Sequence, residues 1–319
     1  MEYNKKINYL RGFGIVLVVL GHSFPTDDFN NNYFYEFIHK FIYSFHMPLF
    51  FWISGFCAIS IYKVKSRNDI KEFYKKKLNR LIVPYCAITL LAVPIKLILN
   101  KFSQRPLIIA ELIKDILIYP VNSPVIYLWY IYALFLMFLL LPIVIKFPPK
   151  IMIIILVLLC TISPNTTNFL AISSLLKNYI FFYLGLLSYG KFERLKVNNI
   201  VTILLFLLLV VVNIFFNNII AFLVTSSIGI LLIINIIQRI NNENAIKSLD
   251  ILAYYSYDIY LFSWFFMTGF RVIFYQILNV NYGTVILILF ISGFMSILLS
   301  KYIIRKNKYL ERIFLGRYN

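Results

Sequence analysis

Apolar runs separated by short polar stretches repeat along the whole 319-residue chain. Runs of about 20 apolar residues are typical of helices that cross a bilayer, so the pattern predicts an all-α, polytopic membrane protein. We place ten spans near 8–24, 37–61, 81–99, 125–145, 150–163, 173–190, 199–216, 219–237, 250–275 and 284–304. The fifth run is short, and only Asn217 and Asn218 join the seventh to the eighth, so the pattern alone also allows nine or eleven spans.

Composition supports this class, because 61% of the residues are hydrophobic and only 14% are charged. Such a chain is unlike a soluble two-domain protein. The first apolar run contains Arg11 and is not preceded by the charged, apolar and small-residue pattern of a cleaved signal peptide. We therefore expect the amino terminus to be mature.

The basic residues decide between the span counts. With ten spans and both termini in the cytoplasm, 24 of the 31 basic residues fall on the inside, many of them in a basic loop at 62–80 and a basic tail at 305–319. This distribution follows the positive-inside rule. Basic loops beside anionic lipid headgroups also explain most of the net charge of +18, so we expect membrane lipid and no nucleic acid as a partner. One membrane-embedded domain over residues 1–319 is predicted.

The first span carries two ionisable side chains where a plain anchor carries none. Arg11 and His22 are eleven positions apart, which is almost three helical turns, so they share one face of the helix roughly 16 Å apart along its axis. Ionisable groups within a span are costly and usually functional. The alternative is an interfacial anchor with a hydrogen-bonded histidine.

The second span holds the other two histidines of the chain, His39 and His46. Helical spacing places both on one face with Tyr43, towards the same interior. Pro48 lacks a backbone N–H, so we expect a kink there that frees a carbonyl near His46 and can open a cavity. Ser54 and Gly55 are small enough to let a neighbouring helix approach closely.

The three cysteines, Cys57, Cys86 and Cys160, fall within or at the edges of apolar runs and have no metal-type spacing. We interpret them as packing residues and expect no metal site. The abundance of Asn, Ile and Lys is typical of an AT-rich microbial genome.

Two motifs together resemble a known family. Arg11 and His22 with ten residues between them, the string Leu20 to Ser23, and the string FHMPLFFWISG from Phe45 to Gly55 are similar to the integral membrane acyltransferase 3 family. Within it, the chain most resembles fucose 4-O-acetylase-like sugar O-acetyltransferases. Ten spans over essentially the whole chain also fit this resemblance.

Weaker similarities follow along the chain. The segment from Lys77 to Pro84 resembles a basic element that usually carries two arginines three apart, but lysine replaces the first one and leaves Arg80 as the second. Tyr127 to Tyr130 resembles an aromatic Leu-Trp motif. The segment from Ser256 resembles one that commonly ends in histidine, and Ser263 stands in that place, so a histidine role is not transferred there.

The resemblance implies transfer of an acyl group, most simply acetyl, from cytoplasmic acetyl-CoA to a hydroxyl of a cell-surface polysaccharide or its lipid-linked precursor, in the inner or plasma membrane of a microbe. Arg11 would hold the donor phosphates, with Lys77 and Arg80 adding positive charge beside it. His22 would act as the general base on the acceptor hydroxyl, with His46 the next candidate. An acyl-histidine intermediate stays open.

Four further residues are candidates for substrate binding: Trp129, Tyr127, Ser54 and Asp258. Trp129 and Tyr127 could stack on a sugar face, although an aromatic belt explains them equally well. Asp258 is the carboxylate placed deepest in a span, and its depth suits pairing with a base such as Arg11. No carboxylate that would orient His22 can be identified from the sequence.

Two other functions compete with acyl transfer. A transporter or flippase of glycan precursors would also carry intramembrane His, Arg and Asp with a proline-kinked helix, but the halves of the chain show no convincing repeat. A non-catalytic subunit of a glycan-assembly complex would fit the departures at Lys77 and Ser263. The identity of the sugar and the formation of a homo-oligomer stay open.

Overall fold

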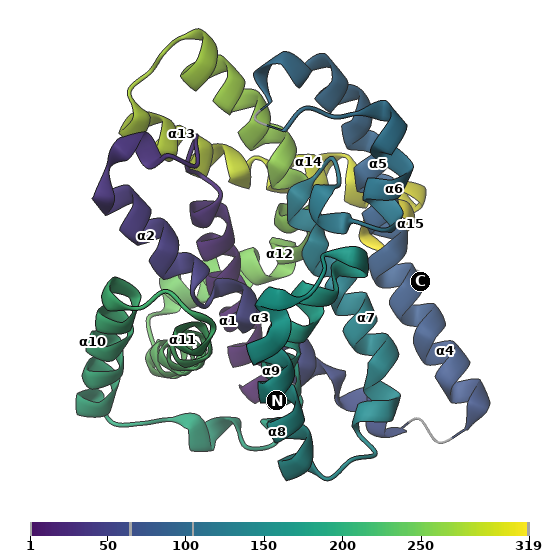
Figure 1. The fold of residues 1–319 in the computed structure, drawn as a ribbon, viewed down its shortest axis with the longest axis vertical. Coiled ribbons are helices and arrows are strands. Elements are labelled where there is room, and N and C mark those ends of the chain that lie inside the picture. The colour runs from purple at the N-terminus through teal and green to yellow at the C-terminus, as the bar shows by residue number, and fades with distance from the viewer. Residues whose placement is uncertain (1, 64–65, 104, 318–319) are drawn as a thin grey trace. The chain divides into compact units, whose positions relative to one another are not determined.

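The computed structural model describes residues 2–63, 66–103 and 105–317 (Figure 1). Within these residues the secondary structure is helical, with no β-strand. The chain divides into two compact units. Unit 1 comprises Met1–Ile59, Ile180–Ser256 and Tyr282–Phe290, and unit 2 comprises Ser60–Tyr179, Tyr257–Asn281 and Ile291–Asn319.

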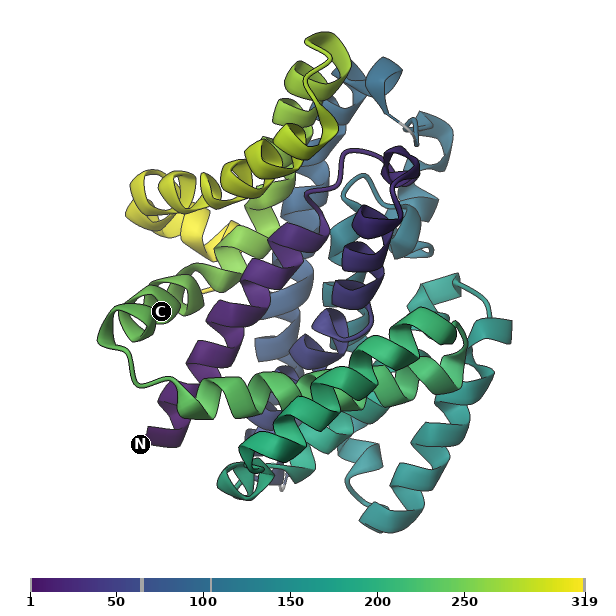
Figure 2. The same ribbon diagram turned by 90° about the vertical axis from the view of Figure 1, so that its left-hand side faces the viewer.

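Unit 1 is built from helices that are distant in the sequence. It contains α1 (Glu2–Gly21), α2 (Tyr33–Tyr43), α3 (His46–Phe56), α10 (Asn199–Phe215) and α11 (Ile219–Arg239), together with parts of α9 (Ile172–Leu187), α12 (Glu243–Phe270) and α13 (Tyr282–Phe294). Helix α1 packs beside α2 and α3, and α10 and α11 form an antiparallel hairpin (Figure 2). The first and second predicted spans therefore pack together in one unit.

Unit 2 contains α4 (Arg67–Lys77), α5 (Val83–Ile98), α6 (Leu112–Leu117), α7 (Trp129–Val144), α8 (Pro149–Ile162), α14 (Ser296–Tyr302) and α15 (Lys308–Leu315). Two stretches are π-helical, Leu78–Ile82 and Arg271–Ile277. Such stretches are rare and frequently lie at functional sites.

Each predicted span falls on a helical stretch. Within the described residues, six stretches are long and apolar enough to cross a bilayer: Tyr33–Tyr62, Arg67–Ile98, Ile126–Val144, Phe169–Leu187, Ile219–Arg239 and Tyr282–Lys306. Helices α8 and α10 are apolar but shorter, and α1 and α12 carry more charge. The polytopic helical class is confirmed, whereas the count of ten spans and the cytoplasmic termini stay predictions.

Large apolar side chains point outward along α10, including Ile200, Leu204, Leu207 and Phe215, each more than half exposed. Water would oppose this exposure, but lipid tails favour it. The outer face of α10 is therefore suited to contact with the bilayer core.

The second predicted span contains a break, although not at Pro48. Helix α2 ends at Tyr43, and α3 begins at His46, which puts Pro48 in the first turn of α3. A proline is tolerated there because an N–H in that turn has no intrahelical partner. The carbonyl of Ser44, four residues before Pro48, instead accepts a hydrogen bond of 2.6 Å from the Ser226 hydroxyl. The predicted position of the kink was wrong, because the helix breaks about one turn before Pro48. The predicted freed carbonyl near His46 is present, and it is that of Ser44.

Helices α3 and α9 approach each other through two glycines. A Cβ placed on Gly55 would lie 1.8 Å from the Phe182 carbonyl oxygen, and one on Gly185 would lie 1.9 Å from the Trp52 carbonyl oxygen. Side chains never come this close to a backbone, so both positions require glycine. The prediction that small residues here allow close helix packing is confirmed for Gly55.

We expect Gly55→Ala to lower the free energy of unfolding by about 1–3 kcal/mol or more, because one methyl group would force α3 and α9 apart. Thermal unfolding of the detergent-solubilised protein measures the change. The matched control is Gly269→Ala, since nothing lies within 4 Å of a Cβ at that helical position. An equal Tm for the two variants would contradict this packing.

The basic segments at 62–80 and 305–319 are largely helical rather than loops; residues 64, 65, 318 and 319 lie outside the described residues. Helix α4 begins with a capping box in which Ser66 and Asp69 exchange hydrogen bonds. Helix α15 packs against α5 in unit 2. Its last carbonyl, that of Leu315, accepts a hydrogen bond of 2.7 Å from the Arg80 guanidinium.

Candidate active site

All three histidines of the chain gather around one tyrosine in unit 1. The Tyr43 hydroxyl lies 2.9 Å from His22 Nδ1. The His39 ring stacks on the Tyr43 ring at a centroid distance of 3.9 Å, and the His46 ring meets it edge-on at 4.6 Å. We call His22, His39, Tyr43 and His46 the histidine cluster.

Local structure explains how α1 reaches this cluster. The backbone N–H of His22 donates to the Val18 carbonyl oxygen, so the helical path continues one residue past the end of α1. A Cβ on the preceding Gly21 would lie only 3.0 Å from the Tyr43 ring. Glycine at position 21 therefore lets the end of α1 approach α2 closely enough for the hydrogen bond between His22 and Tyr43.

The hydrogen bond from or to the Tyr43 hydroxyl can orient the His22 ring, a role for which the sequence offers no carboxylate. A tyrosine hydroxyl both donates and accepts hydrogen bonds. When His22 Nδ1 carries the ring proton and donates to Tyr43, the basic lone pair is on Nε2. The signal available in the sequence was the helical spacing of His39, Tyr43 and His46.

His46 has a defined tautomer. Its side chain is buried, with 1% of its surface exposed, and its Nδ1 lies 2.9 Å from the Ile42 carbonyl oxygen. A carbonyl only accepts, so Nδ1 is the donor, and in the neutral ring the lone pair is on Nε2. No described residue forms a hydrogen bond with this buried Nε2. His46 therefore supplies a second candidate base in the interior of unit 1.

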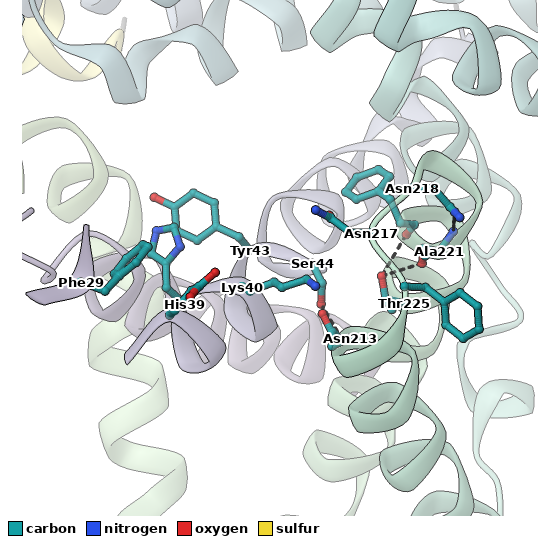
Figure 3. A pocket seen from close by; sticks show the side chains of 13 residues that line it. Phe29, His39, Lys40, Tyr43, Ser44, Asn213, Asn217, Asn218, Ala221 and Thr225 are labelled. Carbon is teal, nitrogen blue, oxygen red and sulfur yellow. Dashed lines mark hydrogen bonds between the residues drawn. The ribbon is translucent and has the colours of Figure 1, made fainter. Parts of the chain in front are cut away.

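A pocket of about 380 Å³ adjoins the histidine cluster (Figure 3). His39 and Tyr43 from α2 form one side, and Asn213, Asn217 and Asn218 at the tip of the α10–α11 hairpin form the other. The remaining lining residues are Phe29, Glu36, Lys40, Ser44, Phe216, Ala221, Phe222 and Thr225. The break after α2 contributes Ser44 to this pocket, in agreement with the expectation that a break in this span opens a cavity.

The loop between α1 and α2 contributes a residue with strained backbone, Phe29, to the lining of the pocket. Hydrogen bonds from the Thr26 hydroxyl and the Asn30 backbone N–H hold the pKa of the Asp28 carboxyl below its usual value.

Phe29 has a φ of 50°, which is uncommon for a residue with a side chain. Its ring packs against His39 at a centroid distance of 4.8 Å. Strained backbone of this kind is often found at functional sites.

Arg11 lies on α1, the helix that leads to His22, as the sequence predicts. Its guanidinium donates to Asn8 Oδ1 at 3.3 Å and to the Cys57 sulfur at 2.9 Å. Cys57 is exposed and contacts Arg11, so it is not only a packing residue. Neither partner of Arg11 is a carboxylate, so its positive charge remains available to an anion.

Lys77 and Arg80 lie in unit 2, at the end of α4 and in the π-helical stretch that follows. The Lys77 ammonium lies 3.7 Å from the centre of the Phe138 ring, and the Arg80 guanidinium lies over the Tyr257 ring at 4.8 Å. The Tyr257 hydroxyl also donates to the Arg80 carbonyl oxygen. These contacts fix both cations within unit 2, and a donor-binding role for them stays a prediction.

The substrate-binding candidates divide between the units. Ser54 is half-buried on α3 in unit 1. Trp129 begins α7 in unit 2, and Tyr127 lies in the short 3₁₀ helix before it, where its carbonyl oxygen accepts a hydrogen bond from the Tyr260 hydroxyl. None of the three lines the pocket beside the histidine cluster. Their contact with a substrate stays a prediction.

Asp258 is fully buried in unit 2, and its partner is Arg305 rather than the expected Arg11. Arg305 Nη2 donates to Asp258 Oδ2 at 2.7 Å and Nε donates to Oδ1 at 2.9 Å, which makes the pair bidentate. The Ser300 hydroxyl also donates to Asp258 Oδ1. Structural pairing, one of the two roles that the sequence left open for this residue, accounts for these contacts. The proposed pairing with Arg11 was wrong.

Among the described residues, no three His, Cys, Asp or Glu side chains lie close enough together to hold a metal ion. Cys160 is buried in unit 2, where its sulfur donates to the Lys177 carbonyl oxygen. Ser263, in the place of the histidine common in the resembled family, is also buried in unit 2. Within the described residues, the candidate acid–base groups therefore gather in the histidine cluster.

Comparison with known proteins identifies the family of the chain. Residues 4–305 match the model of a family described as an acyltransferase domain, Acyl_transf_3. No curated protein matches the chain, and no solved structure matches it. The matched region covers nearly the whole chain, including the histidine cluster, Arg11 and the pocket. The chain therefore belongs to the Acyl_transf_3 family of membrane acyltransferases.

Proposed function

We propose that this protein is an O-acetyltransferase that moves an acetyl group from cytoplasmic acetyl-CoA to a carbohydrate hydroxyl. Family membership supports acyl transfer. The observation that carries the proposal is the histidine cluster, with two basic nitrogens, beside a pocket lined by amide and aromatic side chains. The acceptor would be a cell-surface polysaccharide or its lipid-linked precursor, in the inner or plasma membrane of a microbe.

The cluster can perform the transfer in one displacement. A sugar hydroxyl is a weak nucleophile at neutral pH, so a neutral imidazole that removes its proton accelerates the attack by roughly 10²–10⁴-fold. His22 Nε2 takes this proton while the hydroxyl oxygen bonds to the thioester carbonyl carbon. The C–S bond then breaks, and the leaving thiolate takes the proton from the His22 imidazolium, which returns the histidine to its neutral form. The products are an acetyl ester and free CoA thiol.

Arg11 would hold the donor at the other end of α1. A guanidinium binds phosphate oxygens through two parallel hydrogen bonds, and the CoA diphosphate offers such oxygens. The pantetheine arm is long and thin, so phosphates near Arg11 are compatible with a thioester several helical turns away, near His22. Helix α1 fixes the separation of these two groups.

Labelled substrate tests the proposed function. Purified protein is incubated with acetyl-CoA radiolabelled in the acetyl group and with a glycan or lipid-linked sugar fraction from the source organism. The proposal predicts label in carbohydrate. Folded protein that transfers no label from acetyl-CoA or other acyl-CoA donors would contradict it and favour a transporter or a non-catalytic subunit.

We expect Arg11→Lys to raise the KM for acetyl-CoA roughly tenfold, because lysine keeps the charge but loses the paired hydrogen bonds, one of which is worth about 1.5 kcal/mol. Steady-state kinetics at varied donor concentration measures this change. The control is Lys5→Gln, which removes a whole charge from an exposed position on the same helix. A KM unchanged in Arg11→Lys, or raised equally in both variants, would remove the phosphate-binding role.

A further inference from the structure

The pocket beside the histidine cluster has a lining rich in amides and hydroxyls. Asn213, Asn217 and Asn218 supply three amides, and Ser44 and Thr225 supply two hydroxyls. We infer that this pocket is the binding site for the acceptor carbohydrate, an inference that rests on the proposed function. It assigns the recognition of the acceptor to the tip of the α10–α11 hairpin and to α2.

Two of the amides present hydrogen-bonding atoms to the pocket. Asn217 is exposed, and its side chain makes no hydrogen bond with the described residues. Asn213 Nδ2 donates to the Leu209 carbonyl oxygen and lies 3.4 Å from the Ser44 hydroxyl, whereas its Oδ1 accepts nothing from the described residues. An amide both donates and accepts hydrogen bonds, as each hydroxyl of a sugar does. The amides and the sugar hydroxyls therefore offer each other both hydrogen-bond donors and acceptors.

Aromatic side chains complete the lining. Phe29, Phe216 and Phe222 border the pocket, and Phe216 is 53% exposed. The C–H face of a sugar ring is apolar and packs on such rings, while its hydroxyls point to the sides. The combination of amides with aromatic rings suits a carbohydrate better than a lipid tail, which offers no hydrogen-bonding group to the Asn217 amide or to Asn213 Oδ1.

The charges of the lining residues argue against binding of the acetyl-CoA phosphates in this pocket. Lys40 is the single cation among the lining residues, and Glu36 stands one turn before it on α2. A polyanion would meet little net attraction here. The volume of about 380 Å³ is near the lower end of the range for small-molecule sites, roughly 300–1,000 Å³. The pocket therefore suits a small and largely uncharged group.

The pocket also has the position that an acceptor site requires. His39 and Tyr43 belong both to its lining and to the histidine cluster (Figure 3). His22 and His46 do not line the pocket, but both contact Tyr43, so a hydroxyl held here is separated from the candidate bases by one side chain. The loop after α1 and the turn between α10 and α11 both border it. The charge distribution of the sequence predicts the non-cytoplasmic side for both.

Direct binding tests this site without any acyl transfer. Saturation-transfer NMR on the detergent-solubilised full chain measures contact with methyl glycosides, from a panel of neutral, N-acetylated and acidic sugars. We expect binding by the wild-type protein and at least a tenfold loss of affinity in Asn217→Ala. The matched control is Asn199→Ala, an exposed amide at the opposite end of α10, which should bind as the wild type does.

Kinetics supply a second readout. Asn217→Ala should raise the KM for the acceptor about tenfold and leave kcat and the KM for acetyl-CoA unchanged. Absence of glycoside binding by the wild type, or equal affinity in all variants, would overturn the site. Binding that depends on Asn217 without any transfer of acetyl would support the site and refute the proposed function. Acetyl transfer with an unchanged acceptor KM in Asn217→Ala would support the proposed function and refute this binding site.

Discussion

We expect His22→Ala to lower the rate of acetyl transfer by about 10²–10⁴-fold, the usual contribution of a general base. The hydroxyl would then have to attack the thioester without losing its proton to a positioned group. The protein should stay folded, because His22 lies at the end of α1 and only its side chain is removed. Transfer of labelled acetyl measures the rate, and the thermal transition measures the fold.

A second substitution separates chemistry from structure. His22→Asn keeps a polar atom near the place of Nδ1, which can still pair with the Tyr43 hydroxyl, but it has no basic nitrogen. Both variants should therefore lose activity equally. Recovery of activity in His22→Asn would show that the residue only supports the structure, and His46 would become the candidate base.

The second large effect concerns the fold. We expect Asp258→Ala to lower the free energy of unfolding by about 3–5 kcal/mol, because it leaves Arg305 buried without its counter-charge. The side chains of Asp258 and Arg305 are 1% and 8% exposed, and two hydrogen bonds join them. Thermal unfolding in detergent should show a large decrease in Tm.

The matched control for this prediction is Asp250→Ala, an exposed carboxylate on the same helix, which should leave Tm unchanged. The double variant Asp258→Leu with Arg305→Leu should recover much of the lost stability, since it removes both charges together. A wild-type Tm in Asp258→Ala combined with a raised acceptor KM would contradict the structural role and restore the substrate-binding role.

The fold class could be predicted from the sequence because lipid imposes a simple rule. A span needs about 20 apolar residues, and this chain repeats such runs. The same rule could not locate the break in the second span, because the position depends on the Ser226 hydroxyl, which satisfies the Ser44 carbonyl from a helix far away in the sequence. It also could not show the two π-helical stretches, which depend on local packing.

The candidate site could be predicted in part. Helical spacing placed His39, Tyr43 and His46 on one face, and the three side chains do meet. The hydrogen bond between Tyr43 and His22 joins two helices, so no local pattern contains it. The role of Asn213 and Asn217 in the pocket depends on the α10–α11 hairpin packing near α2. For Asp258, depth in a span indicated a buried partner but did not identify Arg305.

The most direct test of the account compares wild type with His22→Asn in one acetyl-transfer reaction, with free CoA thiol and alkali-labile acetyl ester on carbohydrate counted together. For the wild type, direct transfer with His22 as the base predicts one CoA released per ester formed. In His22→Asn both products should fall together by about 10²–10⁴-fold. Ester formation at the wild-type rate in His22→Asn would contradict the account.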